Sequence, residues 1–242
     1  MRFLLGVDDT DNLESRGTGH RARMLGGGLA ENGLAQLISI TRHQLLVSPL
    51  IPYTSHNSSA CLELEAPASN RIAIWQAAKD FVCTDSAPGS DAGLCLADIS
   101  QVSKLKSWGR RAKQEVLQKI EARILAGEDG PWLAELTGDG GGIIGAAAGV
   151  GLRAGGNDGR FLWLPGLREL TGCLSSCDIM KQTGIGRICT SAGVDLPPDT
   201  MLDVGDWLRP VLLNEIPVLM VEEDSDGNWH TLAKEDVKRL SQ

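Results

Sequence analysis

Apolar and polar positions along this chain alternate in segments that favour strands and helices in turn. Runs of apolar residues typical of strands occupy residues 2–7, 37–47, 60–66, 94–99 and 160–164. Apolar residues at helical spacing predict helices over residues 19–32, 69–83 and 104–126. This order predicts the α/β class, with α+β layered sheets and helices packed against them.

The predicted helix over 104–126 combines an apolar stripe with a cluster of positive charge. The residues that recur at a spacing of three and four are Leu105, Trp108, Ala112, Val116, Ile120 and Ile124. The basic residues around Trp108 are Lys104, Lys106, Arg110, Arg111 and Lys113. A solvated helix face is the favoured interpretation of these charges, and a local contact with phosphate or RNA is the alternative.

A β-rich pattern returns near the C-terminal end. Residues 207–213 and 217–223 are typical of strands, and Asp226-Gly227 predicts a hairpin turn. We therefore expect a core over residues 1–186 and a small β-rich domain over residues 187–242.

Composition and charge limit the partners. A chain of 242 residues with 42% hydrophobic side chains can bury a core, and its net charge of −8 opposes a broad electrostatic grip on nucleic acid. Arg2 leads into a strand and then into acids, unlike a signal peptide, and no stretch approaches the ~20 apolar residues of a membrane span. We expect a cytoplasmic protein with no membrane partner, whose RNA binding is weak and local.

The cysteines do not show the spacing of a metal site. Cys173 and Cys177 form the one close pair, and no second pair completes a set of four zinc ligands. Reduced, mostly buried thiols are therefore expected at Cys61, Cys83, Cys95, Cys173, Cys177 and Cys189.

Three carboxylates follow directly on the first predicted strand. Asp8, Asp9 and Asp11 lie within four residues and repel one another unless a cation or backbone donors lie among them. Ligands of α/β sheets bind at strand ends, so these acids predict a Mg²⁺ site and hence a nucleotide site. The alternative is that Asp11 or Asn12 caps a turn and the other acids are solvated.

A glycine cluster opens a helix of small residues later in the chain. Residues 138–142 read Gly-Asp-Gly-Gly-Gly, and no Gly-Lys-Ser/Thr follows, so the cluster is not a P-loop. Its backbone N–H groups could hold an anion at the helix N-terminus, or its small residues could simply permit close packing. The sequence leaves both interpretations open.

Four motifs in order resemble one family. Gly6–Asp11, Ile51–Thr54 with Asn57, Pro88–Leu94 and Gly141–Ala146 are similar to segments of archaeal tRNA(Ile) 2-agmatinylcytidine synthetases. The resemblance spans roughly residues 1–185 and implies a kinase-like domain beside a ferredoxin-like domain. It also implies ATP-dependent phosphorylation of a tRNA cytosine, followed by replacement of the activated oxygen with agmatine.

The chain departs from this family at several positions. Residues 17–21, Gly-Thr-Gly-His-Arg, stand where the family has Gly-Met-Cys-Thr-Thr, so Thr18 is a displaced substitute for a threonine that takes part in the chemistry. Ser55, His56 and Ser58 replace basic residues of the family. The family's OB-fold and zinc ribbon are also expected to be missing, which favours the ATP site over the tRNA substrate.

The resemblance implies roles for individual residues. It places Mg²⁺ on Asp8, Asp9 and Asp11, against the triphosphate of ATP. Residues expected to hold phosphate through backbone amides are Gly141, Gly142 and Gly145. Arg21 is the candidate for stabilising transferred charge, and Thr18 and His20 are further catalytic candidates, although a lone histidine is more often structural. Asn57 and Asp91 are expected to orient substrate or to contact a second metal, or else to form turns.

The predicted function is that of a Mg-ATP-dependent phosphotransferase or ligase with an unidentified acceptor and an open oligomeric state. A non-catalytic nucleotide-binding or RNA-partner protein is the first alternative. Residues 4–11 also resemble the opening of haloacid-dehalogenase-type phosphatases, with Asp9 as nucleophile and Asp11 as acid, which would require an aspartyl phosphate.

Overall fold

The structure of this protein is a computed structural model that describes residues 1–51, 57–127 and 129–240. The chain divides into two units, Met1–Gly155 and Gly156–Gln242. The boundary expected after residue 186 lies inside the second unit, because Phe161, Leu164 and Ile179 share a buried core with Leu202 and Leu219.

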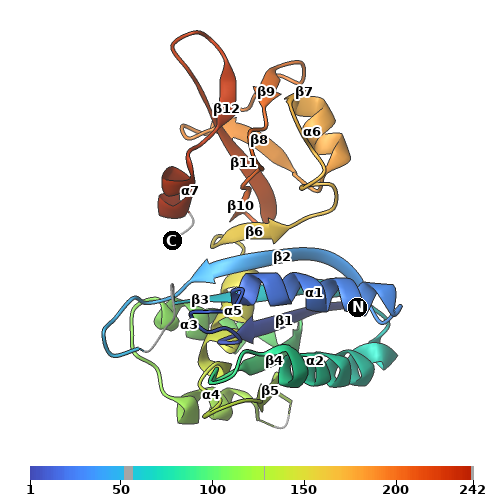
Figure 1. The fold of residues 1–242 in the computed structure, drawn as a ribbon, viewed down its shortest axis with the longest axis vertical. Coiled ribbons are helices and arrows are strands. Elements are labelled where there is room, and N and C mark those ends of the chain that lie inside the picture. Colours follow the sequence, from blue (N-terminus) through green and yellow to red (C-terminus); the bar gives the residue numbers. More distant parts are fainter. Residues whose placement is uncertain (52–56, 128, 241–242) are drawn as a thin grey trace. The chain divides into compact units, whose positions relative to one another are not determined.

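The first unit is built on a sheet in which every pair of neighbouring strands is antiparallel (Figure 1). In sheet order the strands are β5 (Trp132–Glu135), β4 (Gly93–Asp98), β1 (Arg2–Asp8), β3 (Ser58–Glu65) and β2 (Gln36–Gln44). In parallel sheets, ligands bind in a crevice at the carboxyl ends of the strands. Because this sheet is antiparallel, that rule does not explain where the acids that follow β1 lie. Their position depends on the helix that packs beneath the central strand.

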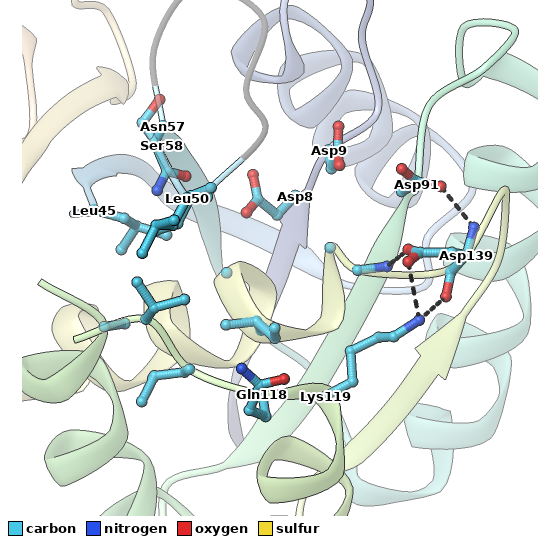
Figure 2. Close-up of a pocket in the computed structure, with 18 of the residues that line it drawn as sticks. Asp8, Asp9, Leu45, Leu50, Asn57, Ser58, Asp91, Gln118, Lys119 and Asp139 are labelled. Carbon is cyan, nitrogen blue, oxygen red and sulfur yellow. Dashed lines mark hydrogen bonds and ion pairs between the residues drawn. The ribbon is translucent and has the colours of Figure 1, made fainter. Parts of the chain in front are cut away.

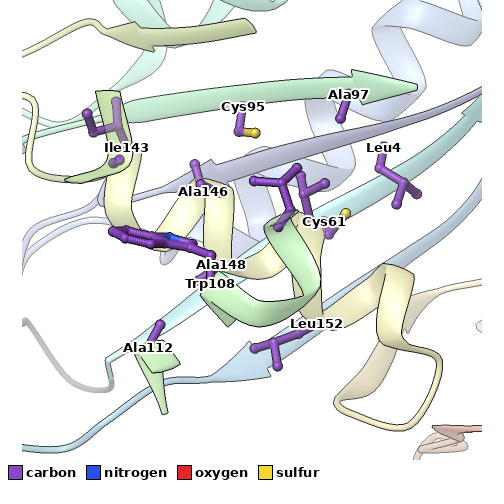
Figure 3. Packing of buried hydrophobic residues seen from close by; sticks show 14 of the residues in the cluster. Leu4, Cys61, Cys95, Ala97, Trp108, Ala112, Ile143, Ala146, Ala148 and Leu152 are labelled. Atoms are coloured by element: carbon purple, nitrogen blue, oxygen red, sulfur yellow. The ribbon is translucent and has the colours of Figure 1, made fainter. Parts of the chain in front are cut away.

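Helices cover both faces of this sheet. On one face lie α3 (Val102–Ala112), α4 (Lys119–Leu125) and α5 (Ile143–Gly155), packed on a core that includes Leu4, Cys61 and Cys95 (Figure 3). The other face is covered by α1 (Thr18–Glu31), where Gly26 approaches Leu37 and Leu62. Beside α1 lie the short 3₁₀ helix Ala68–Asn70 and α2 (Arg71–Asp85).

The close fit of α5 against β1 and against α3 explains its small residues. A Cβ on Gly6 of β1 would lie 2.0 Å from the Ala146 carbonyl oxygen, and a Cβ on Gly151 would lie 1.8 Å from the Leu105 carbonyl oxygen. Backbones that approach this closely leave no room for side chains. The small-residue helix is therefore a packing element.

The single helix expected over residues 104–126 is wrong. The structure has two helices, α3 and α4, and the second starts with a capping box between Gln118 and Glu121. Leu105, Trp108 and Ala112 of the expected stripe are buried. The exposed fractions of Val116, Ile120 and Ile124 are 39%, 61% and 72%. Residues 113–118, between the two helices, instead run past the cavity described below.

The second unit is β-rich, as expected for the C-terminal part of the chain. Its strands in sheet order are β6 (Arg160–Trp163), β10 (Val211–Leu213), β11 (Ile216–Glu223), β12 (Trp229–Thr231), β9 (Met201–Asp203) and β7 (Cys173–Ser175), with β8 (Arg187–Thr190) parallel to β11. Its helices are α6 (Ser176–Gln182) and α7 (Lys234–Leu240). The turn expected at Asp226-Gly227 is confirmed, with Gly227 at a φ of 83° and its N–H donating to the Asp224 carbonyl. The strand expected over 207–213 begins only at Val211.

The structure bears on two general expectations from the sequence. The α/β fold class is confirmed. All six cysteines are free thiols, but only Cys61, Cys95 and Cys189 are buried, fewer than expected. Across the described ranges, the helices are too short or too polar to cross a membrane.

Candidate functional site

A cavity of about 480 Å³ lies in the first unit, where the end of β1 meets the start of α5 (Figure 2). Figure 2 shows Asp9, Asp91, Asp139 and Lys119 on one side of it, and Leu45 and Leu50 with Asn57 and Ser58 on the other. The remaining apolar lining residues are Ile51, Ala112, Val116, Leu117, Ile120 and Ile144. Such a division suits a ligand with one charged and one flat or apolar part.

The cavity unites most of the residues that the sequence predicts for the site. Nine of them line it: Asp8, Asp9, Asp11, Thr18, Asn57, Asp91, Gly141, Gly142 and Gly145. His20 and Arg21 are not among the lining residues. Pro52, Tyr53 and Thr54, from one of the family-like motifs, lie outside the described residues, whereas Ile51 lines the cavity.

Asp8 is the last residue of β1 and lies against the first turn of α5. A Cβ on Gly145 would lie 1.7 Å from Asp8 Oδ2, and a Cβ on Gly142 would lie 2.7 Å from the Asp8 carbonyl oxygen. Any side chain at these two positions would therefore displace the Asp8 carboxylate or its backbone. The two glycines fix where the first acid of the site stands.

Burial and mutual repulsion disfavour the charged forms of Asp8 and Asp9. The pKa of Asp8 is raised well above 3.8, first by burial and then by Asp9. The pKa of Asp9 is raised to about 6 by burial and by the charges of Asp91, Asp11 and Asp139. Asp9 also has a φ of 53°, a left-handed conformation that costs energy for most side chains. A cation between these carboxylates would relieve the repulsion.

Asp11 faces the start of α1 rather than the other two acids. Its Oδ1 accepts hydrogen bonds from the Thr18 backbone N–H at 3.1 Å and from the Thr18 hydroxyl at 2.7 Å. The Thr18 hydroxyl in turn accepts from the Thr10 hydroxyl at 3.0 Å. Asp11 therefore satisfies an open N–H at the helix start, which is the capping role considered from the sequence. The same contact orients the Thr18 proton toward a carboxylate, the geometry of a hydroxyl beside a base.

The described residues do not contain a ready-made metal cage. In these parts of the chain, His, Cys, Asp and Glu side chains form no group of three or more that could hold an ion. Asp11 binds Thr18 through Oδ1, and Asp8 and Asp9 are adjacent oxygen donors at the cavity. Mg²⁺ commonly uses only one or two protein carboxylates together with phosphate oxygens and water. This donor set fits a Mg²⁺ that arrives with a nucleotide.

The backbone amides of the glycine cluster are already engaged. The Asp139 N–H donates to Asp91 Oδ1 at 2.6 Å, and the Gly142 N–H donates to the Asp91 carbonyl at 2.8 Å. The Gly141 N–H donates to Asp139 Oδ1 at 2.7 Å. Asp91 therefore holds this loop in place, and the packing interpretation of the cluster accounts for most of its glycines.

One carboxylate in this loop accepts a backbone N–H and pairs with a lysine. Asp139 Oδ1 accepts the Gly141 N–H, and Asp139 Oδ2 lies 3.3 Å from Lys119 Nζ (Figure 2). A backbone amide and an ammonium group are the donors that bind phosphate oxygens in many proteins. Lys119 is the one basic side chain among the described lining residues, and sequence analysis missed it. The Gln118–Glu121 capping box, which starts α4 at Lys119, was the signal that could have located it.

Arg21 and His20 make contacts outside the cavity. Arg21 Nε donates to the Asp85 carbonyl at 2.7 Å, a second nitrogen donates to the Arg16 carbonyl, and Asp85 Oδ2 lies 3.4 Å away. His20 lies 3.4 Å from Arg16, and the pKa of its imidazole is lowered first by burial and then by neighbouring arginines. Arg21 therefore ties α1 to the end of α2 instead of reaching the cavity.

Arg42 on β2 is a cation near the acids that the sequence did not single out. Burial lowers the pKa of its guanidinium, and the charges of Asp11 and Asp8 oppose that effect. Its Nε donates to Ser58 Oγ at 2.8 Å. A single basic residue within a buried strand was the signal available in the sequence.

Asn57 contacts the backbone beside the cavity, and the basic run forms the solvated helix face that the sequence favoured. The Asn57 amide donates to the Leu46 carbonyl at 2.6 Å and thereby braces the chain beside the cavity. In the basic run, Trp108 is buried and its indole N–H donates to the Ile144 carbonyl at 3.0 Å. Arg111 pairs with Glu115 and Glu121. The run is therefore the outer face of α3, without an exposed aromatic side chain at Trp108.

The fold is similar to that of solved enzymes of tRNA. Among them are crystal structures of TiaS, an agmatidine synthetase of isoleucine tRNA, and of a tRNA fluorescent labeling enzyme. The TiaS complex with its tRNA and ATP is 26% identical, with a TM-score of 0.56 over 62% of this chain and 36% of that chain. The labeling enzyme has the same identity, TM-score and coverage. The TiaS complex with its tRNA, AMPCPP and agmatine is 25% identical, with a TM-score of 0.54.

These similarities confirm the resemblance to the TiaS-like family that the motifs predicted. This chain covers only 36% of the length of the TiaS chain in its ATP complex. No family model and no curated protein matches the sequence.

Proposed function

We propose that this chain is an ATP-dependent enzyme that transfers a phosphoryl group from Mg-ATP to an acceptor in RNA or in a nucleoside. The observation that carries the proposal is the cavity at the end of β1, which joins Asp8 and Asp9 to an anion site and to an apolar wall. Its 480 Å³ lies within the range of about 300–1,000 Å³ that is typical of small-molecule sites.

The apolar wall suits a nucleobase. Leu45, Leu50 and Ile51 line one side of it, and Val116 and Leu117 come from the segment between α3 and α4. Flat rings gain most from burial between such side chains, since their faces are poorly solvated. This is a role for residues 113–118 that one continuous helix would not provide.

The polar side suits the triphosphate. The Gly141 N–H and Lys119 Nζ both bind the Asp139 carboxylate in this structure, so the donors already stand in the geometry that an anion requires. A phosphate oxygen that displaces Asp139 would take over both donors. Lys119 then stabilises the charge that develops on the transferred group, which is where most phosphoryl-transfer catalysis arises.

Asp8 and Asp9 would hold the magnesium ion, which on binding neutralises charge on the phosphate oxygens. Arg42 acts on the same acids from β2 and limits their repulsion in the free protein. Asp11 fixes α1 through Thr18 and thereby keeps the Thr18 hydroxyl at the cavity wall.

The comparisons support the ligands named here. TiaS has been solved with its tRNA and ATP, and with its tRNA, AMPCPP and agmatine. That similarity supports an RNA-related acceptor, and we propose a cytoplasmic location for the enzyme.

Two variants with opposite expected effects on nucleotide affinity test the anion site. Lys119→Gln removes a charge-assisted contact, so the affinity for Mg-AMPCPP should fall about tenfold or more by titration calorimetry. Asp139→Asn removes a competing negative charge, so the affinity should rise. Lys104→Gln, which removes an exposed charge on the outer side of α3, is the matched control and should change nothing.

Turnover separates the proposed enzyme from a protein that only binds nucleotide. Purified protein is incubated with Mg-ATP and total tRNA or nucleosides, and the nucleotide products are identified. We expect ADP formation that depends on acceptor and is lost in Asp8→Asn. Tight nucleotide binding without turnover would favour the non-catalytic alternative, and no change in affinity on Lys119→Gln or Asp139→Asn would refute the anion site.

A further inference from the structure

The second unit contains an aromatic and basic cluster that the ATP site does not use. Arg168 lies over the Trp207 ring at 4.4 Å from the ring centroid, and Arg209 lies at 5.3 Å from it. Both distances are within the range of cation–π contacts. Trp207 belongs to the segment between β9 and β10, and Arg168 to the segment between β6 and β7.

The indole of Trp207 is partly exposed and lies close in the chain to buried residues. Its exposed fraction is 39%, whereas Val204 and Leu208, on either side of it in the chain, are 1% and 2% exposed. Arg168 is likewise flanked by Leu167 and Leu170, which belong to the same buried core as Val204 and Leu208. The two segments are therefore held in place beneath the cluster, and little ordering would be needed when a ligand binds.

Both guanidinium groups keep donors for a ligand. Arg209 donates to the Trp207 carbonyl at 3.2 Å, a contact that uses one of its five N–H groups. Among the residues that the structure describes, no carboxylate forms an ion pair with Arg168 or Arg209. By contrast, Arg187 of the same unit is paired with Asp195.

We propose that Trp207, Arg168 and Arg209 form a binding site for an unpaired base and its phosphates in single-stranded RNA. An exposed indole stacks on the face of a base, and a guanidinium plane can stack as well or donate to phosphate. Bases inside a duplex have both faces covered, so the site selects single strands. The second unit carries more acidic than basic residues, so binding is local and depends on this cluster.

The inference extends the proposed RNA acceptor to a surface of the second unit, and it is tested without ATP. A short fluorescein-labelled oligouridylate is titrated with the full chain, and fluorescence anisotropy gives the affinity. Trp207→Ala should weaken binding about fivefold to 100-fold, which corresponds to the stacking of one base. Trp207→Phe keeps an aromatic face and should retain part of the affinity.

Charge is tested separately. Arg168→Gln with Arg209→Gln should lower the affinity and flatten its salt dependence, since two phosphate contacts on a single strand contribute about 1.4 to the log–log slope. The controls are Ile216→Ala, which removes another side chain that is 39% exposed in this unit, and Lys234→Gln, which removes an exposed charge. Neither control should change the affinity.

Several outcomes would overturn the inference. One is that Trp207→Ala binds oligouridylate as tightly as the unaltered chain, and another is that the chain binds a fully paired RNA duplex as tightly as oligouridylate. The others are that the chain does not bind oligouridylate, or that it binds an oligoglutamate peptide in place of RNA. Calorimetry of Mg-AMPCPP on the same variants reports on the first unit. Nucleotide binding that persists while RNA binding is absent refutes this inference alone.

Discussion

Asp9 is expected to lower the stability of the first unit, so replacing it with asparagine should stabilise the protein. The pKa of Asp9 is raised from 3.8 to about 6, which corresponds to ~3 kcal/mol against its ionised form at neutral pH. The side chain is partly exposed, and solvent screening reduces the expected gain to about 1–2 kcal/mol. Asparagine also tolerates the left-handed φ of 53° at this position, so the change adds no backbone strain.

The gain should depend on pH with a definite sign. Above the folded-state pKa of about 6, Asp9 is ionised in both the folded and the unfolded chain, and the full penalty is present. As the pH falls from about 6 toward 3.8, the folded chain takes up the proton first and the penalty disappears. The difference in unfolding free energy between Asp9→Asn and the unaltered chain should therefore be largest above pH 6 and vanish near pH 4.

Thermal and urea unfolding across this pH range measure the effect. A gain of about 1–2 kcal/mol raises the melting temperature of a unit of this size by about 2–8 °C. Asp199→Asn, at an exposed position of the second unit, is the control and should leave stability unchanged. Mg-AMPCPP should stabilise the unaltered chain but not Asp9→Asn. A variant that is no more stable at pH 7, or a gain that is the same at pH 4, would refute the account of this acid.

The remaining predictions concern the packing of the site and the residues outside it. Gly145→Ala places a Cβ 1.7 Å from Asp8 Oδ2, so calorimetry should show loss of nucleotide binding, with about 1–3 kcal/mol lost in stability. Gly155→Ala in the same helix has no atom within 4 Å of the new Cβ, and an equal effect there would contradict the argument. Arg21→Gln should lower the free energy of unfolding by about 1–3 kcal/mol in urea titrations, because two buried contacts to backbone carbonyls are lost, with nucleotide affinity unchanged. His20→Ala should leave ATP turnover unchanged, because His20 does not line the cavity. A large loss of turnover would indicate that His20 takes part in the reaction.

Local sequence was sufficient where neighbouring residues decide the structure. The apolar run of residues 2–7 predicted β1 because a strand that is buried on both faces has a continuous apolar sequence. The crowding of Asp8 and Asp9 needed only their adjacency in the chain, and both line the cavity as predicted. The hairpin turn at Asp226-Gly227 followed from glycine's freedom to adopt positive φ.

Contacts between distant segments decided the rest of the site. His20 and Arg21 lie two and three residues after Thr18, yet the helical rotation of α1 turns Arg21 toward α2 and away from the cavity. Lys119 and Asp139 are twenty residues apart and meet only because α4 starts anew at its capping box. Periodicity alone favoured one long helix there, since the stripe from Leu105 to Ile124 fits an uninterrupted period.

The sequence by itself therefore determined the element types, the acidic strand end and the family resemblance. The tertiary structure decided which groups the ambiguous residues contact. Gly142 lies against the backbones of Gly93 and Asp8, and Gly145 leaves room for the Asp8 carboxylate. Asp11 binds the Thr18 N–H because α1 starts beside it. Such choices depend on which backbone approaches a residue from elsewhere in the chain, and spacing along the sequence contains no information about that approach.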